Sequence, residues 1–490
     1  MLQQLEVADD VRRRVAAETS RKRKSELGQF MTPSSVARFM ASLFSDSNLE
    51  TCRLLDAGAG VGALSCAFLD RWMAGGFRFQ AVEAFAYEVD DTLRSHLTEH
   101  LSAYKGVRPH IFADDFISSS NLLLFQGETN YTHAILNPPY KKINSHSHHR
   151  HELRALGIET VNLYSAFVAL AVLQAAQGGE IVAIIPRSFC NGPYYRPFRN
   201  FILQRAALHH IHLFDSRNKA FRDDEVLQEN IIIRLERGGV QGPVTITTST
   251  DDSFSDFETH VYPFKQIVFP NDPEGFIHAP TSPNENTFDA SSGISYSLAD
   301  IGVSVSTGPV VDFRLKDYLF DMPEPGTVPL LYPGHFNSKG TDWPIAGAKK
   351  PNAILRNGDT EKWLFPSGTY CVVRRFSSKE EKRRIVANVV HPRAFGDAQV
   401  LGFENHLNVF HENKRGLPEP LAAGLAAFLN STAVDATFRR FNGHTQVNAT
   451  DLKTMKYPSR SALMELGRWA INFVEATQQM IDERIDRLKA

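Results

Sequence analysis

The chain has 490 residues, of which 42% are hydrophobic and 22% charged, and its formal net charge is −2. This length suits two to four domains with substantial cores, and the near-neutral charge gives no overall attraction to nucleic acid. No run of about 18 apolar residues is present, and the start, "MLQQLEVADDVRRRV", lacks the apolar stretch of a signal peptide, so we expect a cytoplasmic protein with no membrane segment. The four cysteines form no C-x-x-C pair, which argues against a disulfide framework and against a thiolate zinc site.

The first half of the chain predicts an α/β fold. A basic N-terminal helix is expected over residues 1–27, which include "RRRVAAETSRKRK". From about Leu54 to about Leu235, short apolar β-type runs such as "CRLLDA", "YTHAILN" and "EIVAIIP" alternate with segments of helical periodicity such as "NLYSAFVALAVLQAAQ". This alternation predicts a Rossmann-like, mainly parallel sheet with helices on both faces. The last two runs, "HHIHLF" and "ENIIIRLE", have no helical segment between them, so we expect them to close the sheet as a hairpin.

The second half differs in composition. After "LERGGVQGP" a Thr/Ser-rich run interrupts the alternation, and we place a domain boundary near Gly238. The following residues, up to about Phe410, are rich in Pro, Gly, Asn, Ser and aromatics, and two helical segments come after them. The sequence thus predicts an α/β domain over 1–238 and a separate α+β domain over 239–490.

A glycine-rich turn follows the first β-type run. In "LLDAGAGVGALSCAF" the strand ends near Asp56, and Gly58, Gly60 and Gly62 let the backbone turn tightly and approach a ligand. Gly58, Gly60 and Ala63 also satisfy the G-x-G-x-x-A variant of dinucleotide-binding proteins. The turn alone therefore leaves nicotinamide or flavin binding open.

Acidic residues stand at the next two runs. Glu83 lies in "FRFQAVEA", and a carboxylate at a strand end can accept hydrogen bonds from both ribose hydroxyls of a nucleoside. Asp114, Asp115 and Phe116 in "IFADDFI" suit an adenine amino group and its ring face. Three consecutive runs with such endings predict a nucleoside site along one edge of the sheet.

Asn137-Pro138-Pro139-Tyr140 follows the fourth run. The prolines fix φ and extend the preceding residue, so the Asn137 side chain and the Pro138 carbonyl are held as neighbouring acceptors. An amine on an aromatic ring is a poor nucleophile because its lone pair is delocalised, and two acceptors that bind its hydrogens free that lone pair to attack a methyl group. Tyr140 offers a face on which a planar base stacks. Taken alone, the tetrapeptide is also compatible with an ordinary proline-stiffened turn.

Several segments occur in an order that is specific in combination: "LGQFMTPSSVARFM", "LLDAGAGVGAL", "AVEA", "ADDF", "LNPPY", "NLYSAF" and "GGEIVAIIPRSF". Together they resemble the N6-adenine DNA methyltransferases of type II restriction-modification systems, in the class with a C-terminal target-recognition domain. The resemblance covers about the first half of the chain. It implies a fold that binds S-adenosylmethionine (AdoMet) at the carboxyl ends of the strands and methyl transfer to a flipped-out adenine.

The resemblance also implies roles for individual residues. Those that would bind AdoMet are Thr32 and Pro33, which precede the sheet and close over the methionine end, Asp56, Gly58 and Gly60 along the methionine moiety, Glu83 at the ribose, and Asp115 with Phe116 at the adenine. Those that would act on the target base are Asn137, Pro138 and Pro139 in the catalytic loop, Tyr140 as a stacking ring, and Phe221 as a second aromatic. For Phe221, a core position in the hairpin is the alternative.

The loop "KKINSHSHHRHELRALGIETVNLY" resembles a segment found in one subset of these enzymes. Lys141, Lys142 and Arg150 suit contacts with DNA phosphates. Its histidines are irregularly spaced, and methyl transfer from a sulfonium needs no metal, so we expect a DNA-side or solvated loop and no metal site. These histidines are His146, His148, His149 and His151.

The second half resembles, in patches, the target-recognition domains of type I specificity subunits. Its predicted DNA-facing stripe is "RRFSSKEEKRR", with Arg374, Arg375 and Lys379. No acidic-pair-plus-lysine nuclease signature is found there, so DNA cleavage would need a separate restriction endonuclease. Protein glutamine methylation and RNA adenine methylation are the alternatives, but the large C-terminal region and the lack of a recognisable RNA-binding module favour double-stranded DNA as the partner.

Overall fold

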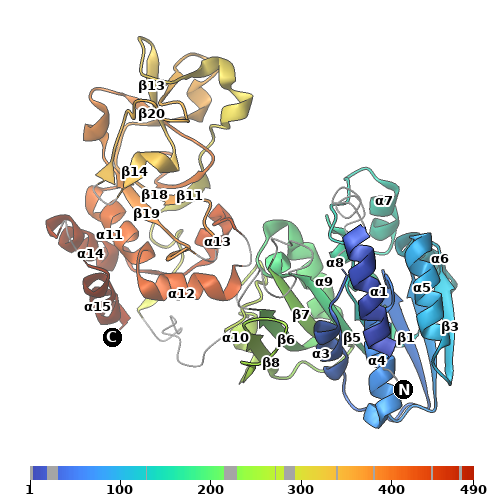
Figure 1. The fold of residues 1–490 in the computed structure, drawn as a ribbon. Coiled ribbons are helices and arrows are strands. Elements are labelled where there is room, and N and C mark those ends of the chain that lie inside the picture. The colour runs from blue at the N-terminus through green and yellow to red at the C-terminus, as the bar shows by residue number, and fades with distance from the viewer. Residues whose placement is uncertain are drawn as a thin grey trace. The chain divides into compact units, whose positions relative to one another are not determined.

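The computed structural model divides the chain into two compact units, Met1–Pro283 and Asn284–Ala490. The first unit runs from blue to green in Figure 1, and the second from yellow to red. The structure describes residues 4–18, 31–127, 130–214, 229–270, 272–280, 293–337, 340–378, 381–442, 445–473 and 477–489.

A nine-stranded sheet forms the centre of the first unit, in the order β3-β2-β1-β4-β5-β7-β6-β8-β9 (Figure 1). Its strands are β1 (Thr51–Ala57), β2 (Ala81–Tyr87), β3 (Val107–Phe112), β4 (Tyr131–Leu136), β5 (Ala175–Pro186), β6 (Ala206–Phe214), β7 (Asn230–Arg237), β8 (Val244–Ser249) and β9 (Glu258–Tyr262). Neighbours among β1 to β5 pair in parallel, whereas β7 pairs antiparallel with both β5 and β6. The predicted mainly parallel α/β sheet and its closing hairpin are therefore confirmed.

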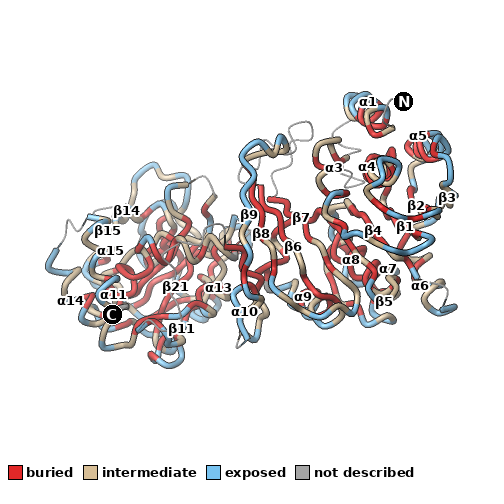
Figure 2. The backbone as a smooth tube through the Cα atoms, turned by 90° about the horizontal axis from the view of Figure 1, so that it is seen from below, coloured by how far each residue is buried: buried red, intermediate tan, exposed pale blue. Residues whose placement is uncertain are grey.

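Helices cover both faces of this sheet, and Figure 2 shows its strands as largely buried. Successive side chains of a strand point to opposite faces, so a strand that is covered twice is apolar throughout. In β4, Leu136 packs into a core with α8 and α9, whereas its neighbour Ile135 packs into a second core with α1, α3, α4 and α5. The helices are α1 (Gln4–Glu18), α3 (Ser34–Ser42), α4 (Ala63–Arg71), α5 (Asp91–Ser102), α6 (Phe116–Gln126), α7 (His148–Ala155), α8 (Leu163–Gln174), α9 (Arg196–Arg205) and α10 (Phe264–Ile267).

Helix α1 covers the first part of the predicted N-terminal helix, and some of its charged side chains are buried. The described helix α1 ends at Glu18, and residues 19–30 lie outside the described part of the chain. Arg12 is buried and bonds to the equally buried Asp9 at 2.7 Å. Part of the basic run thus serves packing inside the first unit.

The first unit extends well past the boundary expected near Gly238. β8 pairs in parallel with β6, and β9 pairs antiparallel with β8, so both strands continue the same sheet. Gly238 itself has a φ of 65°, and its N–H donates to the carbonyl of Arg205, so it belongs to a turn at the end of β7. The compact units divide at Pro283 instead, because the hydrogen-bonded ladder runs on beyond the glycines.

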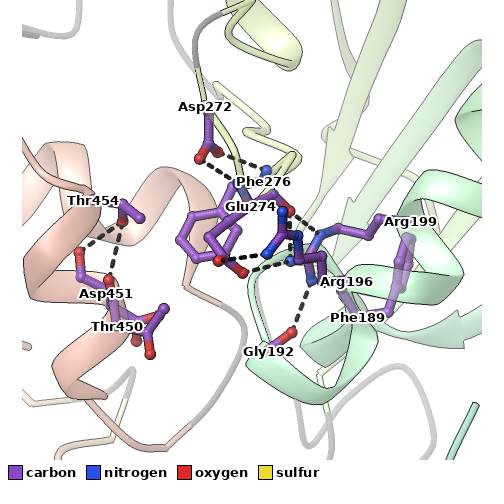
Figure 3. Close-up of polar contacts among 10 residues, drawn as sticks. All are labelled: Phe189, Gly192, Arg196, Arg199, Asp272, Glu274, Phe276, Thr450, Asp451 and Thr454. Atoms are coloured by element: carbon purple, nitrogen blue, oxygen red, sulfur yellow. Dashed lines mark hydrogen bonds and ion pairs between the residues drawn. The ribbon is translucent and has the colours of Figure 1, made fainter.

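A buried arginine fixes the last part of this unit to the loop after β5 (Figure 3). The guanidinium of Arg199, on α9, donates to the carbonyls of Phe189 and Gly192 at 2.9 and 2.8 Å. It also donates twice to the carbonyl of Glu274, at 2.7 and 3.1 Å, and lies 5.1 Å from the centre of the Phe276 ring. These hydrogen bonds are made to backbone carbonyls, and the guanidinium also lies 3.9 Å from the Glu274 carboxylate, so Arg199 holds the two loops together.

The second unit is a mixed α+β unit with short strands, in agreement with the predicted class. A five-stranded sheet has the order β12-β16-β13-β20-β17, a four-stranded sheet has the order β11-β21-β18-β19, and two pairs are β10-β22 and β14-β15. The strands are β10 (Ile294–Tyr296), β11 (Ser304–Thr307), β12 (Leu319–Phe320), β13 (Thr327–Leu331), β14 (Phe336–Asn337), β15 (Gly340–Thr341), β16 (Ala353–Leu355), β17 (Leu364–Pro366), β18 (Tyr370–Arg374), β19 (Ala387–Val390), β20 (Val400–Phe403), β21 (Leu407–His411) and β22 (Tyr457–Pro458). The helices are α11 (Glu419–Leu429), α12 (Thr432–Phe441), α13 (Ala449–Thr454), α14 (Arg460–Asn472) and α15 (Gln478–Lys489).

Two glycines allow α11 and α14 to cross closely. A Cβ atom at Gly424 would lie 1.8 Å from the Leu463 carbonyl oxygen, and one at Gly467 would lie 1.7 Å from the Pro420 carbonyl oxygen. Neither position can carry a side chain at this spacing.

Of the described helices, none alone combines the length and the apolar character needed to cross a membrane; the bent pair α11 and Thr432–Arg440 meets that criterion jointly.

Candidate active site

A cavity lies at the carboxyl ends of β1, β2, β3 and β4, the edge at which α/β proteins bind their ligands. Its walls come from the residues before α3, the turn after β1, the ends of the next three strands, and one face of α8. The lining residues are Met31, Thr32, Gly58, Ala59, Gly60, Val61, Ala63, Leu64, Tyr87, Glu88, Val89, Leu93, Asp114, Asp115, Phe116, Asn137, Pro139, Lys141, Leu163 and Phe167.

The glycine turn forms one wall of this cavity. Gly58 and Gly60 have φ values of 79° and 57°, a region that residues with a Cβ rarely adopt. The N–H groups of Gly58 and Ala59 both donate to the Tyr87 carbonyl at 2.9 Å, which ties the turn to the end of β2. A Cβ at Gly58 would lie 3.7 Å from Cδ of Pro139, so a side chain would fill the space between the turn and the catalytic loop. The missing side chains thus leave a cradle for a ligand.

Glu83 does not occupy the position that the sequence assigned to it. It is the third residue of β2, where its carboxylate lies 3.8 Å from both Arg53 and Arg108, and it is not among the residues that line the cavity. The strand runs on through "AVEAFAY", so its carboxyl end is reached only at Tyr87. The expected contact of Glu83 with a ribose is therefore corrected, because ligands bind beyond the strand end and not beside its first residues.

Glu88 occupies the place at the end of β2 instead. Its side chain is buried and lines the cavity, and its two oxygens accept hydrogen bonds from the backbone N–H groups of Gly60 and Asp90, each at 2.8 Å. Burial raises the pKa of this carboxyl against the opposing effect of those hydrogen bonds. The signal was present in the sequence, since Glu88 is the first acid after an uninterrupted seven-residue strand.

Asp56 is the penultimate residue of β1, just before the glycine turn, and is buried. Ser65 donates to its Oδ2 at 2.6 Å, whereas Oδ1 has no hydrogen-bond partner in the described part of the chain. Burial raises the pKa of Asp56 to about 7, and the hydrogen bonds from Ser65 oppose this increase. A buried carboxylate oxygen without a partner is costly, and a cationic or hydrogen-bond-donating ligand group would satisfy it.

Asp115 and Phe116 stand together at the start of α6 and both line the cavity. Asp115 is the N-cap of the helix, and its Oδ1 lies 3.2 Å from Nε2 of His149. Burial raises the Asp115 pKa, but the hydrogen bond from His149 and those from the helix backbone outweigh it, so the pKa is lowered. The same contact raises the pKa of His149. One of the loop histidines thus has a role beside the cavity.

The segment Asn137-Pro138-Pro139-Tyr140 begins at the end of β4 and presents Asn137 to the cavity. The Asn137 amide nitrogen donates to Oγ1 of Thr32 at 2.9 Å, and the Tyr140 hydroxyl donates to Oδ1 of Asn137 at 3.2 Å. Tyr140 also lies 3.3 Å from the Ile184 carbonyl at the end of β5. Pro138 is buried, whereas Pro139 lines the cavity. The orientation of the amide is therefore set by neighbours on both of its ends.

Backbone pairing holds this loop against the start of α8. Lys141 accepts a hydrogen bond from the Leu163 N–H at 2.8 Å, Ile143 donates to the Val161 carbonyl at 2.8 Å, and Lys142 forms a bridge with Asn162. The segments "NPPY" and "NLYSAF", which stand apart in the sequence, are thus adjacent. Leu163 and Phe167 of the second segment line the cavity, a role that the sequence did not predict.

Comparison with known proteins identifies the family. A profile described as "Eco57I restriction-modification methylase" matches residues 80–221. The chain is 52% identical to the type II methyltransferase M.BsuBI of Bacillus subtilis, over 100% of this chain and 98% of that relative. The chain belongs to the type II methyltransferases of restriction-modification systems. It is also 41% identical to the type II methyltransferase M.PstI of Providencia stuartii, over 98% of this chain and 96% of that one.

Solved structures share the fold of this methyltransferase at low sequence identity. The type IIL restriction-modification enzyme MmeI, solved in complex with DNA, has a TM-score of 0.54 at 11% identity and covers 89% of this chain and 70% of its own. The DrdV–DNA complex has a TM-score of 0.51 at 12% identity and covers 92% of this chain and 58% of its own. These likenesses concern the fold alone.

The basic residues that follow Tyr140 fall into two groups. Lys141 and Lys142 are exposed, and Lys141 also lines the cavity. Arg150 is buried at the start of α7 and forms an ion pair with Glu159. Its expected contact with DNA phosphate is corrected, because a buried, paired guanidinium is not presented to a phosphate.

Among the described residues, no cluster of three or more His, Cys, Asp or Glu side chains is arranged to hold a metal ion.

The remaining predicted residues lie elsewhere. Pro33 is the N-cap of α3 and is not among the residues that line the cavity, and its carbonyl accepts from Ala37 at 2.9 Å. Arg374 and Arg375 are half-buried in the second unit, where Arg374 is paired with Glu381. Phe221 and Lys379 lie outside the described residues.

Proposed function

We propose that this methyltransferase transfers the methyl group of AdoMet to the N6 amino group of an adenine in a specific duplex DNA sequence, after the base has been flipped out of the helix. The observation that carries the proposal is the position of Asn137, which lines the same cavity as the glycine turn and has its amide orientation set by Thr32 and Tyr140. An enzyme that modifies a base inside a duplex must extrude it, because the target atom is otherwise stacked and paired.

The residues of the cavity fit AdoMet. Gly58 and Gly60 leave open backbone on one side of the cavity. Asp56 is buried just behind this turn and is not among the lining residues; its unpartnered Oδ1 would be satisfied by the amino group of the methionine moiety. Glu88 stands at the end of β2, where a carboxylate can accept from ribose hydroxyls, and Phe116 offers an apolar ring face. When bound, AdoMet supplies a methyl group on a positively charged sulfur, which is already activated for nucleophilic attack.

The catalytic loop would then act on the adenine amine. Oδ1 of Asn137 and the carbonyl of Pro138 would accept hydrogen bonds from its two N–H groups, which favours a pyramidal nitrogen and localises the lone pair for attack. After the new N–C bond has formed and the S–C bond has broken, one amine proton is released to solvent. Thr32 binds the nitrogen end of the Asn137 amide, so the oxygen end remains the acceptor. Tyr140 provides a stacking face for the flipped base, with the edge of Tyr164 packed against it at 6.1 Å between ring centres.

Double-stranded DNA is the proposed macromolecular substrate, and the second unit is the proposed reader of its sequence. The family supports both points, since a type II methyltransferase protects the sites that a restriction endonuclease of the same specificity would cut. That endonuclease would be a separate protein in the cytoplasm, where the host DNA lies. The competing substrates, a protein glutamine and an RNA adenine, would require neither a DNA-reading unit nor an extruded base.

The reaction is tested by incubating the protein with AdoMet and duplex DNA, digesting the DNA to nucleosides, and separating the products by mass spectrometry. The expected product is N6-methyl-2′-deoxyadenosine. Because the reaction should not depend on a divalent metal, adding EDTA should leave the yield of this product unchanged. Methylation on cytosine, or methylation of RNA or protein in place of DNA, would refute the proposal.

Asn137→Ala tests the mechanism. Transfer should fall by roughly 100-fold or more, because the substitution removes an acceptor that acts on the attacking amine. AdoMet affinity, measured by calorimetry, should change little, since the cradle of glycines and Glu88 is untouched. Asn144→Ala, at an exposed position of the same loop, serves as the matched control and should transfer at the normal rate. Loss of AdoMet binding in Asn137→Ala would show that the residue has been assigned to the wrong step.

A further inference from the structure

Three segments of the second unit lie side by side and form one ridge, defined here as residues 374–377, 404–407 and 445–447. Arg375 donates its backbone N–H to the carbonyl of His406 at 2.8 Å, which continues the pairing of β18 with β21. On the other side, Phe376 forms an antiparallel bridge with Gln446, flanked by hydrogen bonds from Ser377 to the Thr445 carbonyl and from Val447 to the Arg375 carbonyl. Segments from three distant parts of the sequence are thereby joined through their backbones.

The ridge presents an unusual set of side chains. Phe376 is 39% exposed, and its ring lies 4.8 Å from that of His406. The guanidinium of Arg375 lies 5.8 Å from the Phe376 ring and donates to Oε1 of Gln446 at 3.3 Å and to the Asn405 carbonyl at 3.1 Å. An arginine and a glutamine are therefore held next to each other, beside a partly exposed aromatic ring.

Buried polar groups hold two of these segments from beneath. Arg384, which is 1% exposed, donates Nε to the Ser377 hydroxyl at 3.1 Å and Nη2 to Oδ1 of Asn442 at 2.7 Å. Asn442 in turn donates to the Gln446 carbonyl at 3.0 Å. The positions of Phe376 and Gln446 are thus connected through a buried chain of hydrogen bonds.

Further buried groups hold the flanks. Asn408, which is fully buried, donates to the Val447 carbonyl at 2.7 Å. Glu404, also fully buried, accepts from both the backbone and the ring of His406, at 2.9 and 2.6 Å. Desolvating these polar groups costs free energy that a purely apolar core would avoid, so they specify position more than they add stability. A surface that must present side chains in one geometry needs this kind of support.

We propose that this ridge reads base edges of duplex DNA, with Arg375 and Gln446 as the base-contacting pair and Phe376 as an apolar contact; the inference rests on the proposed function. Arg donates a fork of hydrogens to guanine, Gln both donates to and accepts from adenine, and an aromatic side chain meets the thymine methyl group. A phosphate contact would require only positive charge and would not explain a fixed amide.

Gln446→Ala is the primary test, because the Gln446 side chain is half-exposed and its removal leaves the backbone bridge intact. The variant and the wild type are each given AdoMet and a DNA library, and methylated bases are located by sequencing. The preference for the wild-type site over sites that differ by one base pair should fall about tenfold at one position only. The dependence of DNA affinity on salt concentration should stay unchanged, because no phosphate contact is removed.

Arg375→Ala is expected to relax the preference at the same or an adjacent position. Arg314→Ala is the matched control. Arg314 also places its guanidinium against an exposed phenylalanine, Phe313, at 5.4 Å from the ring centre, but it lies outside the ridge. This control should keep the wild-type preference. Thermal unfolding and AdoMet affinity establish that each variant is folded.

If Gln446→Ala keeps the wild-type site preference, the assignment is overturned. It is also overturned if the variant methylates all sequences less well to the same degree and its DNA affinity depends less steeply on salt concentration. Equal relaxation in Arg314→Ala would also overturn it, because the effect would then not be confined to the ridge. If the wild-type protein methylates no DNA, the proposed function fails. The wild-type sample therefore distinguishes failure of the proposed function from failure of the base-reading assignment.

Discussion

Thr32 and Asn137 are 105 residues apart in the sequence, yet one hydrogen bond of 2.9 Å joins their side chains. An asparagine amide has a donor end and an acceptor end, and only the acceptor end is useful to an attacking amine. By accepting from the nitrogen, the Thr32 hydroxyl would leave the oxygen end for the adenine amine in the proposed mechanism. Thr32 was expected to close over the cofactor, and the structure adds this orienting contact.

Substitution of Thr32 tests the orienting role. Thr32→Val is nearly isosteric but cannot accept a hydrogen bond, so kcat should fall roughly tenfold, the value of one hydrogen bond. Thr32→Ser keeps the acceptor and should restore most of the rate. Steady-state kinetics at varied AdoMet concentration gives both kcat and the KM for AdoMet of each variant. A normal kcat in Thr32→Val with a raised KM for AdoMet would assign the residue to cofactor binding alone.

The pair Glu88 and Glu83 distinguishes the observed site from the one predicted. Glu88→Gln keeps the size of the side chain but weakens its hydrogen bonds with the Gly60 and Asp90 backbone, so the Kd for AdoMet should rise about tenfold. Glu83→Gln, within the strand that precedes Glu88, should bind AdoMet normally. Calorimetric titration of both variants decides the matter, and weaker binding in Glu83→Gln alone would restore the original assignment.

At the scale of elements, α3 packs onto β6 and β8 through an aromatic and histidine cluster. The Phe39 ring of α3 lies 4.6 Å from that of His212 on β6, and His212 bonds to Thr247 and Ser249 of β8 at 2.9 and 3.2 Å. Burial, and then the neighbouring His210, lower the pKa of His212 to about 3. β6 and β8 are separated from the strands that border the cavity by β5 and β7, and their histidines serve packing.

This cluster predicts a pH dependence of stability. The folded pKa of His212 is lowered to about 3, below its usual value of 6.5, so the unfolded chain binds the extra proton between those two values. The contribution of His212 is therefore complete above pH 6.5 and is lost as the pH falls toward 3. In His212→Gln the decrease in Tm between pH 7 and pH 5 should be smaller than in the wild type. His148→Gln, whose side chain is 81% exposed, should keep the wild-type decrease; an equal decrease in all three proteins would exclude His212 as a source.

At the scale of the whole molecule, the sequence predicted best where one periodicity runs through a long element. The strands β1 to β7 and the helix α8 follow from apolar runs that a doubly covered sheet requires. Glu83 was misplaced because β2 was taken to end near Ala84, whereas the run continues to Tyr87. Arg150 was misplaced because charge does not reveal burial. In the second unit, strands of two to five residues give too little periodicity, and the ridge joins segments that no local pattern connects.

The division at Pro283 also determines how recognition units can be exchanged between relatives. A chimaera joined near Gly238 would remove β8 and β9 and leave the long edge of β6 unpaired, which invites aggregation. It would also delete Glu274, whose carbonyl satisfies the buried guanidinium of Arg199. A junction placed between residues 281 and 292 keeps both the complete sheet and the hydrogen bonds between Arg199 and Glu274. Under the proposed function, it is therefore the position at which a new recognition unit would be joined to an intact first unit.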